Sequence, residues 1–235
     1  MILIDAVYIN SFGGKTILEL IIEKIINSRT SYHVLFDSRL RSKYLDIVNN
    51  KDYTIVIARH KNRKHFYLKN INKFSSILCL SNIPPPTYSS VKTSIFFHNS
   101  LLLNPFIHEI SFKNRLINFF KFIYIKYYNQ KDYNWVVQTP HIYKLLLDSL
   151  KINLEQVSIC PIIKKESELN RTEKIINNFV YVSSGVSHKN HIRLIKAFIK
   201  TANTTDKEIK LHLTLNKEEL LKKKHPNNLK VEFHG

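Results

Sequence analysis

The sequence predicts an α/β fold in which parallel strands alternate with helices in two successive units. Three observations support this fold class. Short apolar runs of strand length recur between segments that have the apolar spacing of helices. The first run leads through a glycine turn into a helix, which is how such units begin. A polar, charged stretch at residues 164–177 separates a first series of elements from a second.

The first unit opens with an apolar run at residues 1–8, which we interpret as a buried strand. Residues 10–15 are expected to form a turn that holds Gly13 and Gly14. In residues 16–27 the apolar side chains recur three and four positions apart, at Ile17, Leu18, Ile21, Ile22, Ile25 and Ile26. This spacing predicts a helix with one buried face.

The same alternation continues to residue 163. Further strands are expected at residues 33–36, 53–58, 76–80, 93–97, 135–138 and 156–160, and helices at residues 61–71, 112–128 and 141–150. The prolines of residues 82–86 exclude a regular element there, because proline cannot donate a backbone hydrogen bond. Residues 1–163 are therefore expected to form one domain.

A second α/β domain is expected at residues 178–235, after the linker at 164–177. Its strands are predicted at residues 178–183, 208–215 and 229–234, and its helices at residues 191–202 and 217–224. A parallel sheet of three strands with one uncovered face buries little apolar surface. We therefore expect this second domain to be incomplete and the chain to be truncated.

The chain is strongly basic. Lysine and arginine outnumber aspartate and glutamate by 36 to 18, which gives a formal net charge of +18. Such a charge favours polyanionic partners, namely nucleic acid, an anionic bilayer or phosphorylated substrates. An AT-rich coding bias toward Lys, Asn and Ile is an alternative source of part of it. The hydrophobic content of 44% excludes a disordered chain.

Other features bear on the compartment. No run reaches the about 18 uncharged apolar residues that span a bilayer, and the N-terminus lacks the features of a signal peptide. Cys79 and Cys160 form neither a metal motif nor a disulfide framework. We expect a cytoplasmic protein that is soluble or peripheral to a membrane.

Residues 179–198 (FVYVSSGVSHKNHIRLIKAF) carry the most informative pattern. They combine a strand, a small-residue loop, a basic residue at Lys189 followed by Asn190, and a helix that ends in Ala-Phe. This segment resembles the start of the C-terminal domain in family 4 glycosyltransferases, the group-1 enzymes of lipopolysaccharide and capsule assembly.

Features of the first unit extend the resemblance. The opening strand with its glycine pair, NIPP at residues 82–85, FFHN at 96–99 and VVQTP at 136–140 resemble the acceptor domain of O-antigen glycosyltransferases. The resemblance implies a GT-B type architecture, with a Rossmann-like N-terminal domain and an incomplete second Rossmann-like domain. Two departures stand out: no arginine precedes Lys189 in its loop, and the acidic Glu-x7-Glu element of the family would lie beyond residue 235.

The resemblance implies that the diphosphate of a nucleotide-sugar donor binds before the helix at residues 191–202. The GT-B type stabilises this leaving group with helix N-termini and cationic side chains rather than with a metal. The candidate donor-binding residues are Ser183, Ser184, Lys189 and Asn190. The alternative is that Lys189 is a solvated loop lysine.

Further candidates follow strands of the first unit, at the edge where open parallel sheets bind ligands. His98 is the candidate catalytic base, because imidazole can accept a proton near neutral pH. The alternative is a structural, hydrogen-bonded histidine. Thr139 is expected to cap the helix that follows it. The candidate acceptor or cleft residues are Gly13, Gly14, Lys15, Asn82 and Asn99, although a plain turn would also explain the two glycines.

Neither a metal nor a cofactor is expected. His188 and His191 stand three positions apart, but no third ligand is spaced to join them. The nucleotide-sugar would be a substrate.

Residues 112–128 are rich in aromatic and basic side chains. At about 100° per residue, one apolar stripe that we expect to pack on the domain comprises Phe112, Leu116, Phe119, Phe120, Ile123 and Tyr127. The opposite face, suited to an anionic bilayer surface, would then expose Arg115, Lys121, Phe122, Ile125 and Lys126. A helix buried on two sides, or an ordinary wet surface, is the alternative.

Together these features predict a hexosyltransferase that moves a sugar from a nucleotide-sugar to a growing, lipid-linked bacterial surface glycan. The resemblance implies a retaining, metal-independent reaction, on the cytoplasmic face of the plasma membrane. Two alternatives stay open. One is a non-catalytic truncated remnant, and the other is a basic protein that binds a membrane surface or nucleic acid. No signature of a specific nucleic-acid-binding fold supports the last of these.

Overall fold

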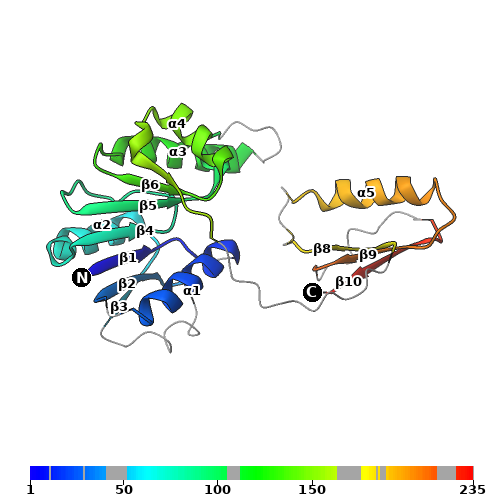
Figure 1. Ribbon diagram of the computed structural model, residues 1–235, viewed down its shortest axis with the longest axis horizontal. Coiled ribbons are helices and arrows are strands. Elements are labelled where there is room, and N and C mark those ends of the chain that lie inside the picture. The colour runs from blue at the N-terminus through cyan, green and yellow to red at the C-terminus, as the bar shows by residue number, and fades with distance from the viewer. Residues whose placement is uncertain are drawn as a thin grey trace. The chain divides into compact units, whose positions relative to one another are not determined.

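The computed structural model describes residues 1–10, 12–28, 30–40, 52–104, 112–162, 176–183, 185, 189–215 and 226–234. The described residues up to 162 belong to one compact unit and those from 176 on to a second. Each unit combines helices with a parallel sheet (Figure 1), which confirms the predicted α/β class. Most of the predicted linker and the predicted helix at residues 217–224 lie outside the described residues.

The first unit is built on a seven-stranded parallel sheet in the order β3-β2-β1-β4-β5-β6-β7. Its strands are β1 (Ile2–Ala6), β2 (Tyr32–Asp37), β3 (Tyr53–Val56), β4 (Ser76–Cys79), β5 (Lys92–Phe97), β6 (Asn134–Val137) and β7 (Val157–Ile159). The chain adds β2 and β3 on one side of β1 and then returns to add β4 on the other. This reversal is the topological switch point of a doubly wound, Rossmann-like sheet.

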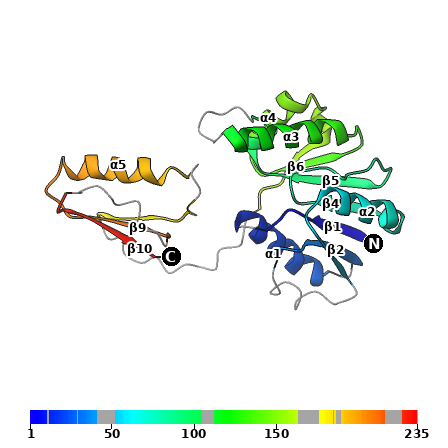
Figure 2. The ribbon, with the colours of Figure 1, turned by 180° about the vertical axis from the view of Figure 1, so that it is seen from behind.

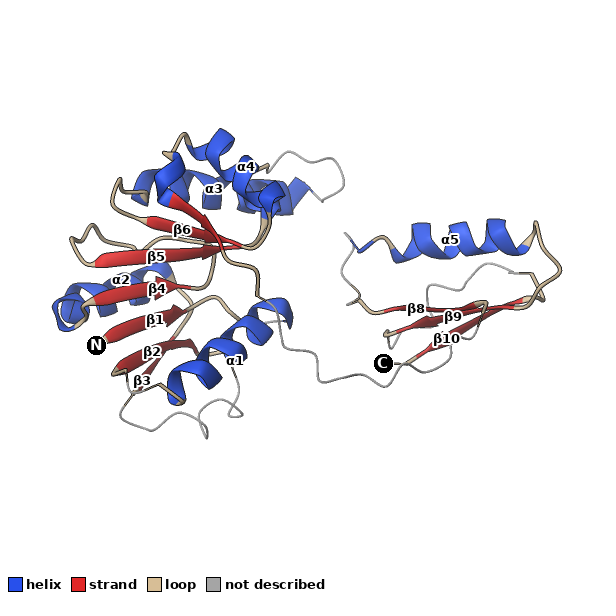
Figure 3. Cartoon of the chain, in the orientation of Figure 1, coloured by secondary structure: helices blue, strands red, loops and turns tan. Residues whose placement is uncertain are grey.

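Helices cover both faces of this sheet (Figures 1, 2 and 3). On one face α1 (Phe12–Ile26) buries Ile17, Leu18 and Ile22. On the other face lie α2 (His60–Asn70), α3 (Phe112–Tyr128) and α4 (Pro140–Leu150). Short 3-10 turns are η2 (Ile71–Lys73), η3 (Ser100–Leu102) and η4 (Leu154–Gln156). Thr139 caps α4 by accepting a hydrogen bond from the amide of Ile142, as predicted.

A buried polar cluster ties the centre of the sheet to α2. Arg63 and Asp5 are both fully buried, and the Arg63 Nε donates to Asp5 Oδ2 at 2.8 Å. The Tyr67 hydroxyl donates to the same oxygen at 2.5 Å. Arg63 Nη1 also donates to the carbonyl of Pro84 at 2.9 Å and to the Tyr124 hydroxyl at 3.3 Å. One guanidinium thus links β1, the loop after β4, and α3.

The start of α1 differs from the prediction. The sequence predicts a turn that holds Gly13 and Gly14 before a helix from residue 16, but α1 begins at Phe12 and neither glycine has a positive φ. A Cβ added to Gly14 would lie 3.2 Å from Ile9, whereas one added to Gly13 would meet nothing within 4 Å. Gly14 therefore allows the helix to start close to the end of β1.

The predicted orientation of α3 is wrong. Ile125, expected on a membrane-facing side, is fully buried in the core, and Phe122 packs against that core. The stripe expected to be buried is exposed instead: Phe112 by 79%, Phe120 by 60% and Tyr127 by 64%. Both faces of this helix are apolar, so spacing alone could not choose between them. The buried face is the one that also brings the Tyr124 hydroxyl to Arg63.

The second unit has a three-stranded parallel sheet in the order β10-β9-β8. Its strands are β8 (Asn178–Tyr181), β9 (Ile209–Leu213) and β10 (Leu229–Phe233), and α5 (His191–Ala202) packs on one face. The contact is made by Ile195 of α5 against Leu211 and Leu213 of β9. Across both units, none of the helices that the structure describes is long and apolar enough to cross a membrane.

Candidate functional site

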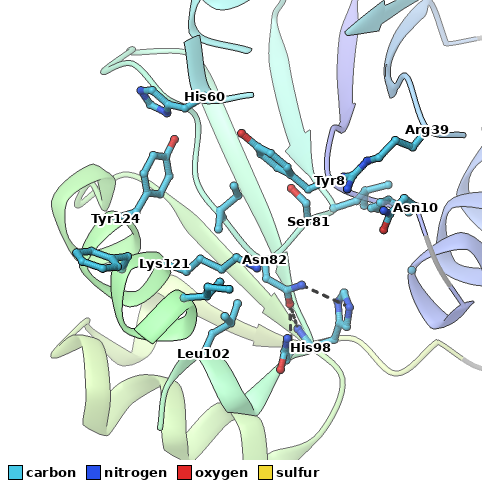
Figure 4. A pocket seen from close by; sticks show the side chains of 17 residues that line it. Tyr8, Asn10, Arg39, His60, Ser81, Asn82, His98, Leu102, Lys121 and Tyr124 are labelled. Carbon is cyan, nitrogen blue, oxygen red and sulfur yellow. Dashed lines mark hydrogen bonds between the residues drawn. The ribbon is translucent and has the colours of Figure 1, made fainter. Parts of the chain in front are cut away.

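A pocket of about 750 Å³ opens at the carboxyl edge of the first sheet (Figure 4). It lies where β1, β2, β4 and β5 end, and α3 and the first turn of α1 complete its wall. This is the switch-point edge at which open parallel sheets bind their ligands. The lining residues are Tyr8, Ile9, Asn10, Gly14, Arg39, His60, Leu80, Ser81, Asn82, Ile83, His98, Asn99, Leu102, Ile117, Phe120, Lys121 and Tyr124.

Most of the predicted acceptor-side residues meet in this pocket. Because the carboxyl ends of neighbouring parallel strands lie at one edge, residues far apart in sequence come together there. The pocket contains Gly14, Asn82, His98 and Asn99. The predicted residues outside its lining are Gly13 and Lys15.

Asn82 organises the floor of the pocket. Its backbone adopts the left-handed conformation, with φ 65°, which asparagine tolerates better than most residues. The buried side-chain oxygen accepts hydrogen bonds from the backbone amides of His98 at 2.7 Å and Asn99 at 3.0 Å. The Asn99 side chain accepts in turn from the amide of Leu101 at 3.1 Å and caps η3. These two asparagines thus hold the loops after β4 and β5 in place.

The geometry around His98 fits a neutral imidazole. Since the oxygen of Asn82 is used by two amides, its nitrogen faces His98 Nε2, at 3.4 Å, and can only donate. Nε2 therefore carries a lone pair. Nδ1 is buried and has no hydrogen-bond partner among the described residues. Desolvation lowers the pKa of His98, so a free base is the favoured form near neutral pH.

Arg39 forms one cationic wall of the pocket. It forms a bidentate salt bridge with the buried Asp37, in which Nε donates to Oδ1 at 2.9 Å and Nη2 donates to Oδ2 at 2.6 Å. Asp37 also accepts the amide of Tyr8 at 3.0 Å. Burial opposes ionisation of Asp37, but the hydrogen bonds and charge of Arg39 outweigh it and lower the pKa. The carboxylate thereby fixes the direction of a guanidinium that remains half exposed.

Lys121, an exposed residue that was predicted to face a membrane surface, forms the opposite cationic wall. Figure 4 shows its side chain extending from α3 toward Asn82 at the end of β4. Desolvation, together with the positive charge of Arg39, lowers the pKa of the Lys121 ammonium. The two positive charges repel one another, and an anion bound between them would offset this repulsion.

The chemical character of the pocket follows from these walls. Arg39 and Lys121 are cationic, His60 adds an imidazole, and the described lining residues include no aspartate or glutamate. Ile117 and Phe120 of α3 add an apolar side, and Phe120 is 60% exposed. The arrangement suits a ligand that combines a negative charge with an apolar part.

The donor-side candidates lie in the second unit. Lys189 and Asn190 are exposed and immediately precede α5, at the carboxyl end of β8. The Tyr181 hydroxyl donates to the carbonyl of Lys189 at 2.8 Å, which fixes the loop to the strand. The Ser183 amide donates to the Thr214 hydroxyl at 2.9 Å. Ser184 lies outside the described residues.

Several residues of these sites are absent from the sequence-based prediction. Tyr8, Arg39 and His60 line the pocket because each follows a strand of the first sheet, and that position was the available signal for them. In the second unit, Nδ1 of His212 in β9 lies 2.9 Å from Nε2 of His234, which directly follows β10, and a glutamate lies next to both. The register of two strands far apart in sequence creates that cluster.

The residues predicted to face a membrane lie in different parts of the first unit. Lys121 belongs to the pocket, and Phe122 and Ile125 belong to the core. Lys126 is exposed and lies over the Phe122 ring, at 4.6 Å from its centroid. Arg115 lies on α3 and is half-buried.

The sequence was also compared with known proteins. No protein-family model matches the chain, and no curated protein matches it. Its function must therefore be inferred from the doubly wound sheet, from the cation-lined pocket at its carboxyl edge, and from the order of the sequence motifs.

Proposed function

We propose that the protein is a glycosyltransferase of the GT-B type, which transfers a sugar from a nucleotide-sugar to a lipid-linked glycan. The observation that carries the proposal is the pocket at the carboxyl edge of the first sheet, with two cationic walls and a neutral histidine. The presence of a second parallel α/β unit supports it, as does the order of the motifs in the sequence.

In this proposal the pocket binds the acceptor. A lipid-linked acceptor carries phosphate between its lipid and its sugars, and Arg39 and Lys121, the two cationic side chains of the lining, are the candidates to contact that phosphate. The hydroxyl that receives the sugar lies near His98. The acceptor hydroxyl takes the place of the Asn82 amide beside Nε2 of His98. Nε2 then takes the hydroxyl proton as the oxygen attacks the anomeric carbon from the face that the diphosphate leaves, so that the bond from sugar to diphosphate breaks with retention of configuration.

The donor binds to the second unit in this proposal. Lys189 and the first amides of α5 stabilise the departing diphosphate, together with Ser183, Ser184 and Asn190. The position of Lys189 before a helix and at the carboxyl end of a strand supports this assignment. As no metal is required for such stabilisation, the reaction is expected to proceed in the presence of a chelator.

The membrane surface is approached through α3. Two of the predicted membrane-facing residues, Phe122 and Ile125, are engaged in the core, so we propose a different set of side chains for this role. We propose that the exposed stripe of α3 enters the bilayer interface, beside the pocket that Phe120 helps to line. This stripe consists of Phe112, Leu116, Phe120, Ile123 and Tyr127.

A transfer assay tests the proposal. The full chain is incubated with UDP- and GDP-linked sugars and bacterial lipid-linked glycan extract, and glycosylated lipid is detected by mass spectrometry. We expect a product that gains one hexose, and a rate about 10²–10⁴ lower for His98→Gln, the usual worth of a positioned base. The matched control is His141→Gln, an exposed histidine of α4. Binding of lipid phosphate without any transfer would instead support the alternative of a non-catalytic, membrane-bound protein.

A further inference from the structure

Three side chains of the types that can ligate a metal meet on the sheet of the second unit. Glu232 of β10 lies directly opposite His212 of β9 in the parallel register. His234 follows two positions after Glu232 and therefore points to the same face. Its backbone amide donates to the carbonyl of Leu213 at 2.8 Å, which holds the end of β10 against β9. Leu211 and Leu213 alternate with His212 and pack under α5, so the three side chains project from the opposite face.

Their donor atoms converge with the spacing of a coordination shell. His212 Nδ1 lies 2.9 Å from His234 Nε2 and 3.2 Å from Glu232 Oε2, and His234 Nε2 lies 3.6 Å from the same oxygen. Three atoms at these separations lie on a circle of radius about 1.9 Å, so a point about 2.0–2.1 Å from all three lies just outside their plane. Zinc bonds to imidazole nitrogen and carboxylate oxygen have this length.

Hydrogen bonds among these three atoms alone cannot make all three of their contacts favourable. If one imidazole nitrogen is protonated, it can donate to the other nitrogen, to the carboxylate, or to both. At least one of the three edges is then a contact between two lone pairs. If both nitrogens are protonated, the two N–H groups oppose one another across 2.9 Å. A single divalent cation just outside the plane of the three atoms can accept all three lone pairs at once.

The surroundings allow a cation to enter. The side chains of His212, Glu232 and His234 are 21%, 46% and 53% exposed. The two lysines of the same face, Lys210 and Lys230, form ion pairs with Glu208 at 3.6 and 2.8 Å, which offsets their charge. Three protein ligands leave a fourth tetrahedral position open to water.

We propose that His212, Glu232 and His234 bind one Zn²⁺ ion and thereby join β9 to β10. Two imidazoles and one carboxylate are a set of ligands that zinc prefers, and copper and nickel would compete for the same site. The proposal is independent of the sugar-transfer reaction, since it concerns different residues and needs no donor or acceptor.

Calorimetric titration of the tag-free full chain with zinc chloride near neutral pH tests the proposal. We expect one saturable equivalent of Zn²⁺. His212→Ala and His234→Ala should each weaken binding at least about tenfold, and Glu232→Gln should weaken it less, because neutral oxygen is the poorer ligand. The matched controls are His141→Ala and Cys160→Ser, which remove an exposed histidine and an exposed thiol elsewhere and should leave binding unchanged.

A second measurement does not depend on the folding of any variant. In the unsubstituted chain, substoichiometric paramagnetic Co²⁺ should broaden the ring-proton resonances of His212 and His234 before those of the other histidines. Three results would overturn the proposal. They are no saturable Zn²⁺ binding, binding that survives in the His212→Ala/His234→Ala double variant, or Co²⁺ broadening that appears first elsewhere.

Discussion

At the scale of single residues, the fully buried ion pair between Arg63 and Asp5 connects the core to the pocket. Its guanidinium reaches Asp5 in β1, the carbonyl of Pro84 after β4, and the hydroxyl of Tyr124 in α3. Burying two charges is unfavourable by itself, so such a pair contributes little net stability compared with a well-packed apolar pair. Its value here is geometric, because it sets the positions of elements that carry pocket residues.

Removal of one partner should therefore destabilise the fold by far more than the small net contribution of the ion pair suggests. Arg63→Met leaves the Asp5 carboxylate buried with the Tyr67 hydroxyl but without a counter-charge. We expect the free energy of unfolding to fall by about 3–5 kcal/mol, measured by urea denaturation. Arg59→Met, an exposed position just before α2, is the control and should change stability by less than about 0.5 kcal/mol. Equal effects of the two substitutions would contradict this interpretation.

Anion binding in the pocket should depend on Lys121. Loss of one contact to a charged group costs about 1.5–3 kcal/mol, so Lys121→Ala should weaken binding of farnesyl diphosphate, a short lipid diphosphate, at least about tenfold. Isothermal titration calorimetry measures this affinity. Lys126→Ala is the matched control on the same helix. The Lys126 ammonium lies over the Phe122 ring and is not among the residues that line the pocket. An equal loss in both variants would indicate general charge attraction instead of a specific contact.

At the scale of elements, α3 shows where prediction from sequence reached its limit. Its existence and length follow from the pattern, and the structure has the same bounds, Phe112–Tyr128. Its orientation could not be predicted, because both faces are apolar and the choice depends on Ile125 and Tyr124 meeting partners from distant elements. The start of α1 was missed because a glycine pair is typical of a turn, whereas here Ile9 lies so near to Gly14 that the helix leaves little room for a side chain at that position.

The exposed stripe of α3 carries a prediction of its own. Phe112 and Ile123 are 79% and 45% exposed, so the double variant Phe112→Ser/Ile123→Ser should leave the fold intact. Burying a side chain of this size contributes about 1.5–3 kcal/mol. We therefore expect at least about tenfold weaker binding to phosphatidylglycerol vesicles in a sedimentation assay.

The matched control for this variant is Leu68→Ser, which removes a 67% exposed leucine from α2. It should leave vesicle binding unchanged, because α2 is not part of the proposed surface. Equal losses in both variants, or vesicle binding that does not respond to either, would assign no special role to α3.

At the scale of the whole molecule, alternation along the sequence was sufficient to predict two α/β units, and the strands of the first unit appear where they were expected. The membership of the pocket was predictable only in part. His98, Asn82 and Arg39 follow recognisable strands, whereas Lys121 enters the pocket through the rotation of α3. That rotation is not encoded in a local pattern.

The stability of the first unit should decrease in mild acid. Burial lowers the pKa of His33, His60 and His98 below the ordinary value. As the pH falls through about 6.5, the unfolded chain takes up protons before the folded one does, so the free energy of unfolding decreases until the folded pKa values are reached. Asp37, whose pKa is lowered, loses its contribution only at more acidic pH, as the carboxylate becomes protonated.

Fluorescence of Trp135, the single and fully buried tryptophan, reports on this unit alone. We expect the midpoint of thermal unfolding to fall between about pH 7.5 and about pH 5.5. His98→Gln should reduce the slope, since a glutamine takes up no proton in either state, whereas the exposed His141→Gln serves as the control with an unchanged slope. A midpoint that stays constant or rises toward pH 5.5 would show that these histidines gain partners for their charged form, which would also remove the argument for His98 as a neutral base.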